Sequence, residues 1–151
     1  MKSNNESGRS LVEMLGVLTI IGVLGVGVIS SVNFGMESMR VAAVYDEVEV
    51  TAQGVRDLYS WQRNYPSDTA SMREKICNNG VFDRDCTANH VVTTPWGNLE
   101  VSSGGDDHFM ITLTNVPKRA CERLLAYQWK NVTPETNACG ENTTDIEFRG
   151  E

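Results

Sequence analysis

The chain has 151 residues, with 20 acidic and 13 basic side chains and a net charge of −7. A long apolar segment near its start leaves room for one further domain of roughly 100 residues. The acidic excess lies wholly after residue 40. We therefore expect no binding of nucleic acid through bulk charge, because such binding needs lysine and arginine to replace phosphate counterions.

The first predicted element is an apolar helix from Leu11 to Val32. About 22 residues at ~1.5 Å each span roughly 33 Å, which is enough for a bilayer core. Lys2 and Arg9 precede it, so the positive-inside tendency predicts a cytoplasmic N-terminus and an outward domain. A cleaved secretory signal is the alternative, but its apolar core is shorter and ends in an A-x-A type site, of which "VISSVNF" is a poor version.

Glu13 places a carboxylate inside this apolar run. Within a bilayer such a group costs roughly 2.5–3.5 kcal/mol on insertion scales. Two interpretations remain open from the residue alone. Either the side chain reaches the headgroups from the start of the helix, or it is kept to pair with a positive charge.

The segment "GRSLVE" from Gly8 to Glu13, followed by some twenty apolar residues, resembles the class III signal of type IV prepilins. The resemblance implies that residues 1–8 are a cytoplasmic leader and that a prepilin peptidase cuts between Gly8 and Arg9. It also implies N-methylation of Arg9 and an assembly role for Glu13, the fifth mature residue, opposite the new ammonium of a neighbouring subunit. The family usually begins its mature chain with Phe, whereas this chain has Arg9.

Beyond the apolar run, a helical pattern continues without proline until Pro66. Its apolar residues recur every three or four positions, which predicts one buried stripe: Val41, Val44, Tyr45, Val48, Ala52, Val55, Leu58 and Tyr59. One continuous helix over about residues 9–63 would be roughly 80 Å long. The alternative is an anchor and a separate helix, with a break at residues 33–35.

The remainder predicts a small antiparallel sheet with helices added to it. After a stop at Tyr65-Pro66, Ser67 or Asp68 is expected to cap a short helix. The runs "HVVTT", "GNLEVSS", "HFMITLTNV" and "TTDIEF" are typical of strands, and "PWG" and "SGGDD" of turns. A further helix is expected from Asn115 as cap with Pro117 in its first turn. The predicted fold class is therefore α+β.

The stretches "TTPWGNLEV" and "FMITLTNVPKRACERL" resemble the heads of type IVb thin-pilus pilins, including those of conjugation systems. The resemblance implies a long N-terminal helical spine packed on the sheet. Its parts would be a transmembrane and filament-core helix at 9–33, an amphipathic half at 34–65 and a globular head at 66–151.

The four cysteines are expected to form two disulfides on the outer side of the membrane, where such bonds persist. Three pairings exist for Cys77, Cys86, Cys121 and Cys139. Pairing of neighbours closes two modest loops, and the family resemblance favours Cys121 with Cys139. No metal site is expected, because the chain has no C-x-x-C pair and its two histidines lie at no matching spacing.

Other chemistry is sparse. The acidic loop residues are typical of turns rather than of cation sites: Asp83, Asp85, Asp106 and Asp107, with His108 beside the last. No nucleophile elbow is present, so we predict neither enzymatic activity nor a cofactor. Trp61, Trp96 and Trp129 are adhesive aromatics or, several times more commonly, core or subunit contacts.

The resemblance implies a structural pilus subunit that polymerises with itself. Its partners would be the prepilin peptidase, the pilus assembly machinery and the bacterial inner membrane, and its destination an extracellular pilus. The alternatives are a minor pilin or type II secretion pseudopilin and, from another class, an unprocessed signal-anchored periplasmic binding domain. Whether such a filament serves conjugation, attachment or motility does not follow from the residues.

Overall fold

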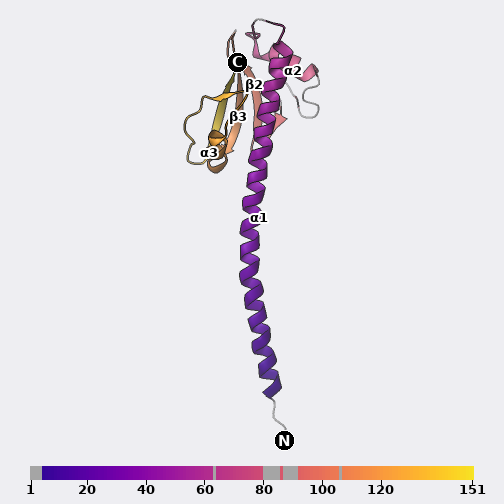
Figure 1. Cartoon of the computed structure of the whole chain (residues 1–151), viewed down its shortest axis with the longest axis vertical. Coiled ribbons are helices and arrows are strands. Elements are labelled where there is room, and N and C mark those ends of the chain that lie inside the picture. The colour runs from indigo at the N-terminus through magenta and orange to yellow at the C-terminus, as the bar shows by residue number, and fades with distance from the viewer. Residues whose placement is uncertain (1–4, 63, 80–85, 87–91, 106) are drawn as a thin grey trace. The chain divides into compact units, whose positions relative to one another are not determined.

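The computed structural model describes residues 5–62, 64–79, 86, 92–105 and 107–151, without the side chains of 5–10, 25–31, 33 and 34. Within these residues the fold is α+β (Figure 1). The helices are α1 (Asn5–Tyr59), α2 (Thr69–Asn78) and α3 (Lys118–Ala126). The strands are β1 (Val92–Thr93), β2 (Asn98–Ser103), β3 (Phe109–Pro117), β4 (Thr133–Pro134) and β5 (Thr143–Gly150).

Helix α1 continues without a break through residues 33–35. The alternative of an anchor followed by a separate helix expected a break there. It ends at Tyr59, four residues earlier than expected. The Ser60 hydroxyl donates to the Asp57 carbonyl oxygen at 2.9 Å, and the Gln62 N–H donates to the Tyr59 carbonyl oxygen at 2.9 Å. These tighter bonds replace the i→i−4 ladder and end the helix.

The chain divides into two compact units, Met1–Met39 and Arg40–Glu151, and each is described by itself. In the first unit every residue from Leu11 to Leu24 is exposed. In the described part of the chain, no helix combines the length and apolar character needed to cross a membrane. The transmembrane segment expected at residues 9–33 is therefore not supported.

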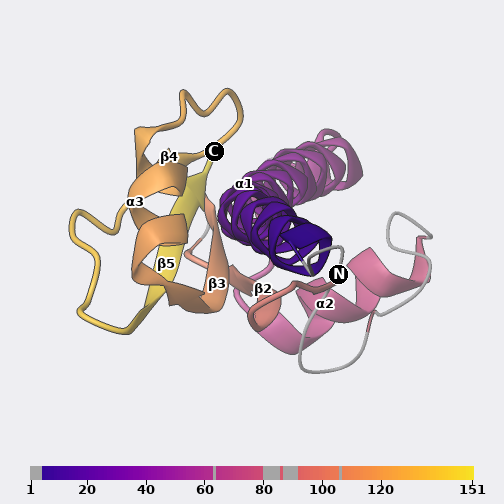
Figure 2. The same ribbon diagram turned by 90° about the horizontal axis from the view of Figure 1, so that it is seen from below.

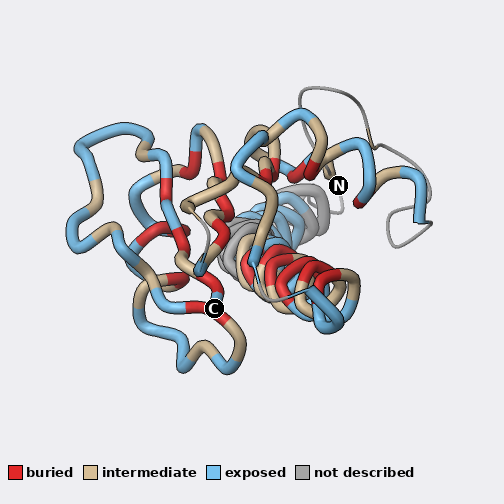
Figure 3. Tube along the Cα trace, turned by 90° about the horizontal axis from the view of Figure 1, so that it is seen from above, coloured by how far each residue is buried: buried red, intermediate tan, exposed pale blue. Residues whose placement is uncertain are grey.

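The second unit contains one hydrophobic core. Helix α1 contributes a fully buried stripe with three- and four-residue spacing, shown in red in Figure 3: Val41, Val44, Val48, Ala52, Val55 and Tyr59. Tyr45 and Leu58, which the sequence pattern placed in the same stripe, lie at its margins and are only partly buried. The predicted amphipathic character of this half of the helix is confirmed.

The sheet is antiparallel throughout, in the order β1-β2-β3-β5-β4. Alternate residues of its three longer strands are buried on one face: Leu99, Val101, Phe109, Ile111, Leu113, Ile146 and Phe148. Helix α2 packs on β2, and α3 packs on β3 and β5 (Figure 2). The two helices therefore pack on different strands of the same sheet.

Local interactions fix the ends of the shorter elements. Asp68 caps α2 by accepting from the N–H groups of Ala70 and Ser71, as expected for that residue. The Arg73 Nε donates to the Val101 carbonyl oxygen at 2.6 Å and attaches α2 to β2. The "PWG" turn is closed by the Thr94 N–H, which donates to the Gly97 carbonyl oxygen at 2.8 Å.

The prediction for the start of α3 is wrong by two residues, because the N-cap is Pro117 and not Asn115. Asn115 has a φ of 57° in an irregularity of β3, and Val116 and Pro117 continue the strand opposite Thr144 and Thr143. The Asn115 N–H donates to Asp145 Oδ1 at 2.8 Å instead of beginning a helix. Pairing with the last strand thus extends β3, and α3 begins only at Lys118.

Two disulfides join Cys77 to Cys86 and Cys121 to Cys139, across sequence separations of 9 and 18 residues. This is the pairing of neighbours, and its second bridge is the one that the family resemblance favoured. Cys121 is completely buried in α3. The bridge therefore ties the core to the loop that precedes β5.

Candidate functional site

The N-terminal part of α1 exposes an unusual amount of apolar surface. Ten large apolar side chains between residues 11 and 24 are each more than half exposed: Leu11, Val12, Met14, Leu15, Val17, Leu18, Ile20, Ile21, Val23 and Leu24. A surface of this size on a described segment is typical of a protein or membrane contact. We call residues 11–24 the apolar segment.

The residues predicted for processing and assembly lie at the start of this segment. Gly8 and Arg9 are in the first turns of α1, where only the backbone is described. Glu13 is exposed within the apolar segment itself. One helix thus carries the three positions in one stretch, and their predicted roles in cleavage, methylation and subunit pairing stay predictions.

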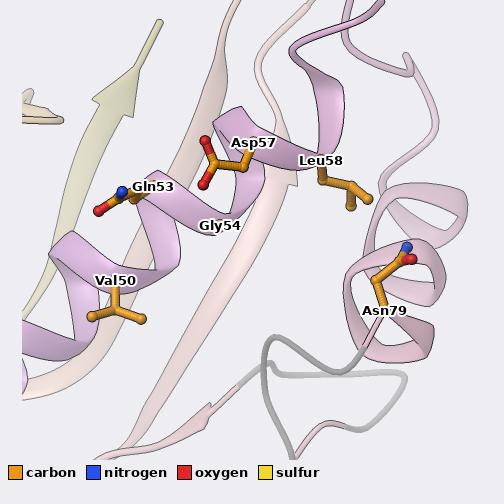
Figure 4. A pocket seen from close by; sticks show the side chains of 6 residues that line it. All are labelled: Val50, Gln53, Gly54, Asp57, Leu58 and Asn79. Atoms are coloured by element: carbon orange, nitrogen blue, oxygen red, sulfur yellow. The ribbon is translucent and has the colours of Figure 1, made fainter.

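A second feature is a hollow on the outer side of α1 in the second unit. Its volume is about 380 Å³, and it is lined by Val50, Gln53, Gly54, Asp57 and Leu58 of α1 and by Asn79 after α2. Figure 4 shows Leu58 and Asn79 facing each other from the two helices. We call it the α1–α2 groove. Gly54 contributes no side chain, which keeps the middle of the groove open.

A third feature is the loop after α3, which is fixed to a different face of α1. The Lys130 N–H donates to Glu49 Oε1 at 2.8 Å, and Asn131 Nδ2 donates to Glu49 Oε2 at 2.7 Å. Arg56 Nη1 donates to Asn131 Oδ1 at 3.1 Å. These bonds join residues more than 70 positions apart and hold the loop in a defined place.

Aromatic rings complete this attachment. Tyr127 stacks on Tyr45 with ring centroids 4.7 Å apart, and Trp129 packs against Tyr45 and Phe148. Tyr45 Oη donates to the Gln128 carbonyl oxygen at 3.1 Å. Desolvation and the nearby Glu49 carboxylate raise the pKa of the Tyr45 phenol.

The remaining polar cluster lies where β2 meets β3. His108 Nδ1 is 2.7 Å from Asp107 Oδ1, and Arg149 Nη2 is 3.6 Å from Asp107 Oδ2. The hydrogen bond with His108 is the main cause that holds the pKa of the Asp107 carboxyl below its ordinary value. This geometry describes an ion pair at the protein surface. Asp83, Asp85, Asp106 and His90 fall outside the described residues.

The described residues contain no group of three or more metal-ligating side chains. The three tryptophans have different environments. Trp96 and Trp129 are partly buried against the core, whereas Trp61 is 96% exposed. Trp61 therefore does not follow the expectation of a core contact within the chain, and it remains available to a partner.

Residues 38–147 match the sequence profile described as PilS N terminal, a pilin-related family. The match covers more than half of the chain. The chain belongs to the PilS N-terminal family. No curated protein matches it by sequence. The family supports a pilin-like, pilus-related subunit and agrees with the α+β fold of residues 40–151.

Sequence reasoning missed the groove and the loop attachment. Glu49, Arg56 and Asn131 are separated by long stretches of chain, and nothing in their local spacing pairs them. The available signal was weaker. Val50 and Gly54 interrupt the polar side of an amphipathic helix, and such a departure from the pattern indicates a second contact surface.

Proposed function

We propose that this PilS-family chain is the structural subunit of a type IV pilus, of the type IVb group that includes thin conjugative pili. Its role is mechanical and not catalytic. The family match supports a pilus-related subunit, and the exposed apolar segment supports assembly through α1. The proposal extends these observations to processing, polymerisation and subgroup.

The observation that carries the proposal is the exposure of the apolar segment within an unbroken helix. Leu18, for example, is 57% exposed, and its neighbours on every side of the helix are exposed too. Burying this surface against equivalent segments of other copies would gain about 25 cal/mol per Å² removed from water. Polymerisation therefore has a physical driving force.

In this proposal the peptidase removes residues 1–8 and leaves Arg9 as the N-terminal residue, which is then methylated. Glu13 of one subunit meets the Arg9 ammonium of the next, because paired opposite charges tolerate burial far better than one charge alone. Before assembly the subunit is held at the bacterial inner membrane. Afterwards it belongs to an extracellular filament.

The test is the intact mass and N-terminal sequence of the protein from membranes and from sheared surface filaments. The expected result is a filament protein that begins at Arg9 and is abundant in the sheared fraction. Low abundance relative to another subunit would identify a minor pilin or a pseudopilin instead. A protein that retains residues 1–8 and stays with the cells would contradict the proposal.

A further inference from the structure

Helix α1 presents two distinct contact surfaces besides its buried stripe. Tyr45, Glu49 and Arg56 hold the loop after α3. The groove residues Val50, Gly54 and Asp57 lie about 130° further around the helix, since each residue turns it by about 100°. The loop and the groove therefore belong to different sides of the same domain.

The loop after α3 forms an exposed edge at residues 126–130, which combines an aromatic ring with a cation. Tyr127 is 42% exposed although its other face stacks on Tyr45. Gln128 and Lys130 are exposed beside it. The backbone of this edge is held by Glu49 and Tyr45, so the edge is presented without a large loss of conformational entropy on binding.

The groove carries a charge opposite to that of the edge. Val50, Gly54 and Leu58 provide apolar contact, and Asp57 provides a carboxylate at the rim. Among the described residues, neither the Asp57 carboxylate nor the Lys130 ammonium has a bonding partner within the chain. On a chain with a net charge of −7, an exposed aromatic edge with a lysine is a specific complement to an apolar, acidic groove.

We propose that the α1–α2 groove of one copy receives the 126–130 edge of a second copy. Tyr127 covers Val50 and Leu58, and Lys130 pairs with Asp57. This contact rests on the proposed function, because it adds a contact between heads to the one made by the apolar segment. Each copy offers one groove and one edge on different sides, so the contact is heterologous and continues from copy to copy.

The first experiment traps the contact in assembled filaments of the full-length chain. The variant carries both Asp57→Cys and Lys130→Cys, and the four native cysteines stay in their disulfides. Because an ion pair through a lysine holds the two backbones further apart than a disulfide allows, a short bifunctional thiol cross-linker is added, and a denaturing gel should show a ladder of dimers, trimers and longer multimers. Each single variant, and the pair Asp46→Cys with Lys130→Cys, serve as controls, since Asp46 is exposed on α1 about three turns from Asp57.

The second experiment reverses charges. Asp57→Lys and Lys130→Asp should each lower the yield of sheared filaments several-fold, and the two together should restore it. Glu141→Lys and Lys118→Glu are the matched controls, because both residues are exposed and change the net charge equally. They should leave the yield unchanged.

The outcomes separate this inference from the proposed function. Normal wild-type filaments with no ladder, or a ladder that stops at dimers, overturn the head contact and leave the pilus proposal standing. A yield that falls for Asp57→Lys but is not restored by the double variant also overturns it and assigns the groove to another ligand. Absence of wild-type filaments overturns the proposed function and this contact with it.

Discussion

Two parts of helix α1, residues 11–24 and the residues from Arg40 onward, carry similar apolar side chains but differ in how far these are buried. From Arg40 onward, valines and a tyrosine on one stripe are buried against the sheet of the same chain. In the apolar segment, residues 11–24, valines, leucines and isoleucines are exposed on all sides. The difference is in what covers them. The second part buries its apolar stripe within the chain, whereas the first part exposes apolar surface of the kind that marks a contact with a partner.

The spacing of apolar residues along α1 already indicates this difference. A helix that is apolar on one stripe folds onto its own domain, whereas a helix that is apolar all round is covered from every direction. The groove is a smaller apolar surface of this kind, because Val50 and Gly54 interrupt the polar side of the second part. The apolar segment and the groove are thus surfaces suited to contacts with another molecule.

The largest expected effect comes from blocking the proposed cleavage between Gly8 and Arg9, which precedes the first part of the helix. Gly8→Val should leave the full-length precursor and abolish filaments, because the peptidase must accommodate a backbone without a side chain at the cut. Gly35→Val is the control, since Gly35 lies outside the apolar segment and a Cβ there would meet nothing within 4 Å in the chain. Intact mass shows whether cleavage fails. A mature protein from the Gly8 variant would refute the processing step.

The second largest effect is expected from Glu13, the carboxylate inside the apolar segment. Glu13→Gln should preserve cleavage but lower assembly, because a buried ammonium that loses its partner costs about 3–5 kcal/mol. The ratio of sheared filament to cell-bound mature subunit measures this effect. An unchanged ratio would mean that the carboxylate only reaches the headgroups.

The second part depends on its own cross-links. Cys121→Ser should lower the free energy of unfolding by about 3 kcal/mol, since the bridge to Cys139 restrains an unfolded loop of 18 residues. Cys77→Ser should cost less, because its loop has 9 residues. Chemical denaturation of the oxidised proteins compares the two. Equal losses would show that loop length does not govern this stabilisation.

A matched pair of substitutions sharpens the comparison within α1 itself. Val48 is 0% exposed and Val17 is 56% exposed. Val48→Ala should reduce the free energy of unfolding by about 2 kcal/mol through the cavity that it leaves. Val17→Ala should leave that free energy unchanged and lower filament yield. Loss of subunit stability in Val17→Ala would contradict the division of roles.

The smallest expected effect concerns the Asp107 ion pair. The pKa of its carboxyl is lowered in the folded state from an ordinary value of 3.8. A lowered folded pKa contributes stability above pH 3.8, and this contribution is lost as the pH falls through the folded pKa. Asp107→Asn should therefore be slightly less stable at neutral pH and equal to wild type in strong acid. A stability difference between Asp107→Asn and wild type that grows as the pH falls would contradict this prediction.

Much of the fold follows from local pattern. The three- and four-residue spacing of Val41, Val44 and Val48 predicts the buried stripe, and Asp68 predicts the start of α2. The alternation of "GNLEVSS" and "TTDIEF" predicts β2 and β5. Periods and caps depend on neighbours in sequence, so a single chain is sufficient to detect them.

The missed features depend on partners far along the chain. β4 has two residues and includes Pro134, so it carries no strand pattern and exists through pairing with β5. Val116 and Pro117 are strand residues because Thr144 and Thr143 lie opposite them. The attachment of Asn131 to Glu49 and Arg56 is likewise set by tertiary packing. Local propensity does not encode such pairings.

The central claim is that the apolar segment is covered by other copies while residues 40–151 keep their own core. A cryo-electron microscopy structure of sheared filaments tests it most directly. The account predicts that residues 11–24 of adjacent copies pack together at the filament centre, with Val41, Val48 and Val55 still buried against their own sheet. Filaments in which residues 11–24 face solvent, or in which this chain is absent, would contradict it.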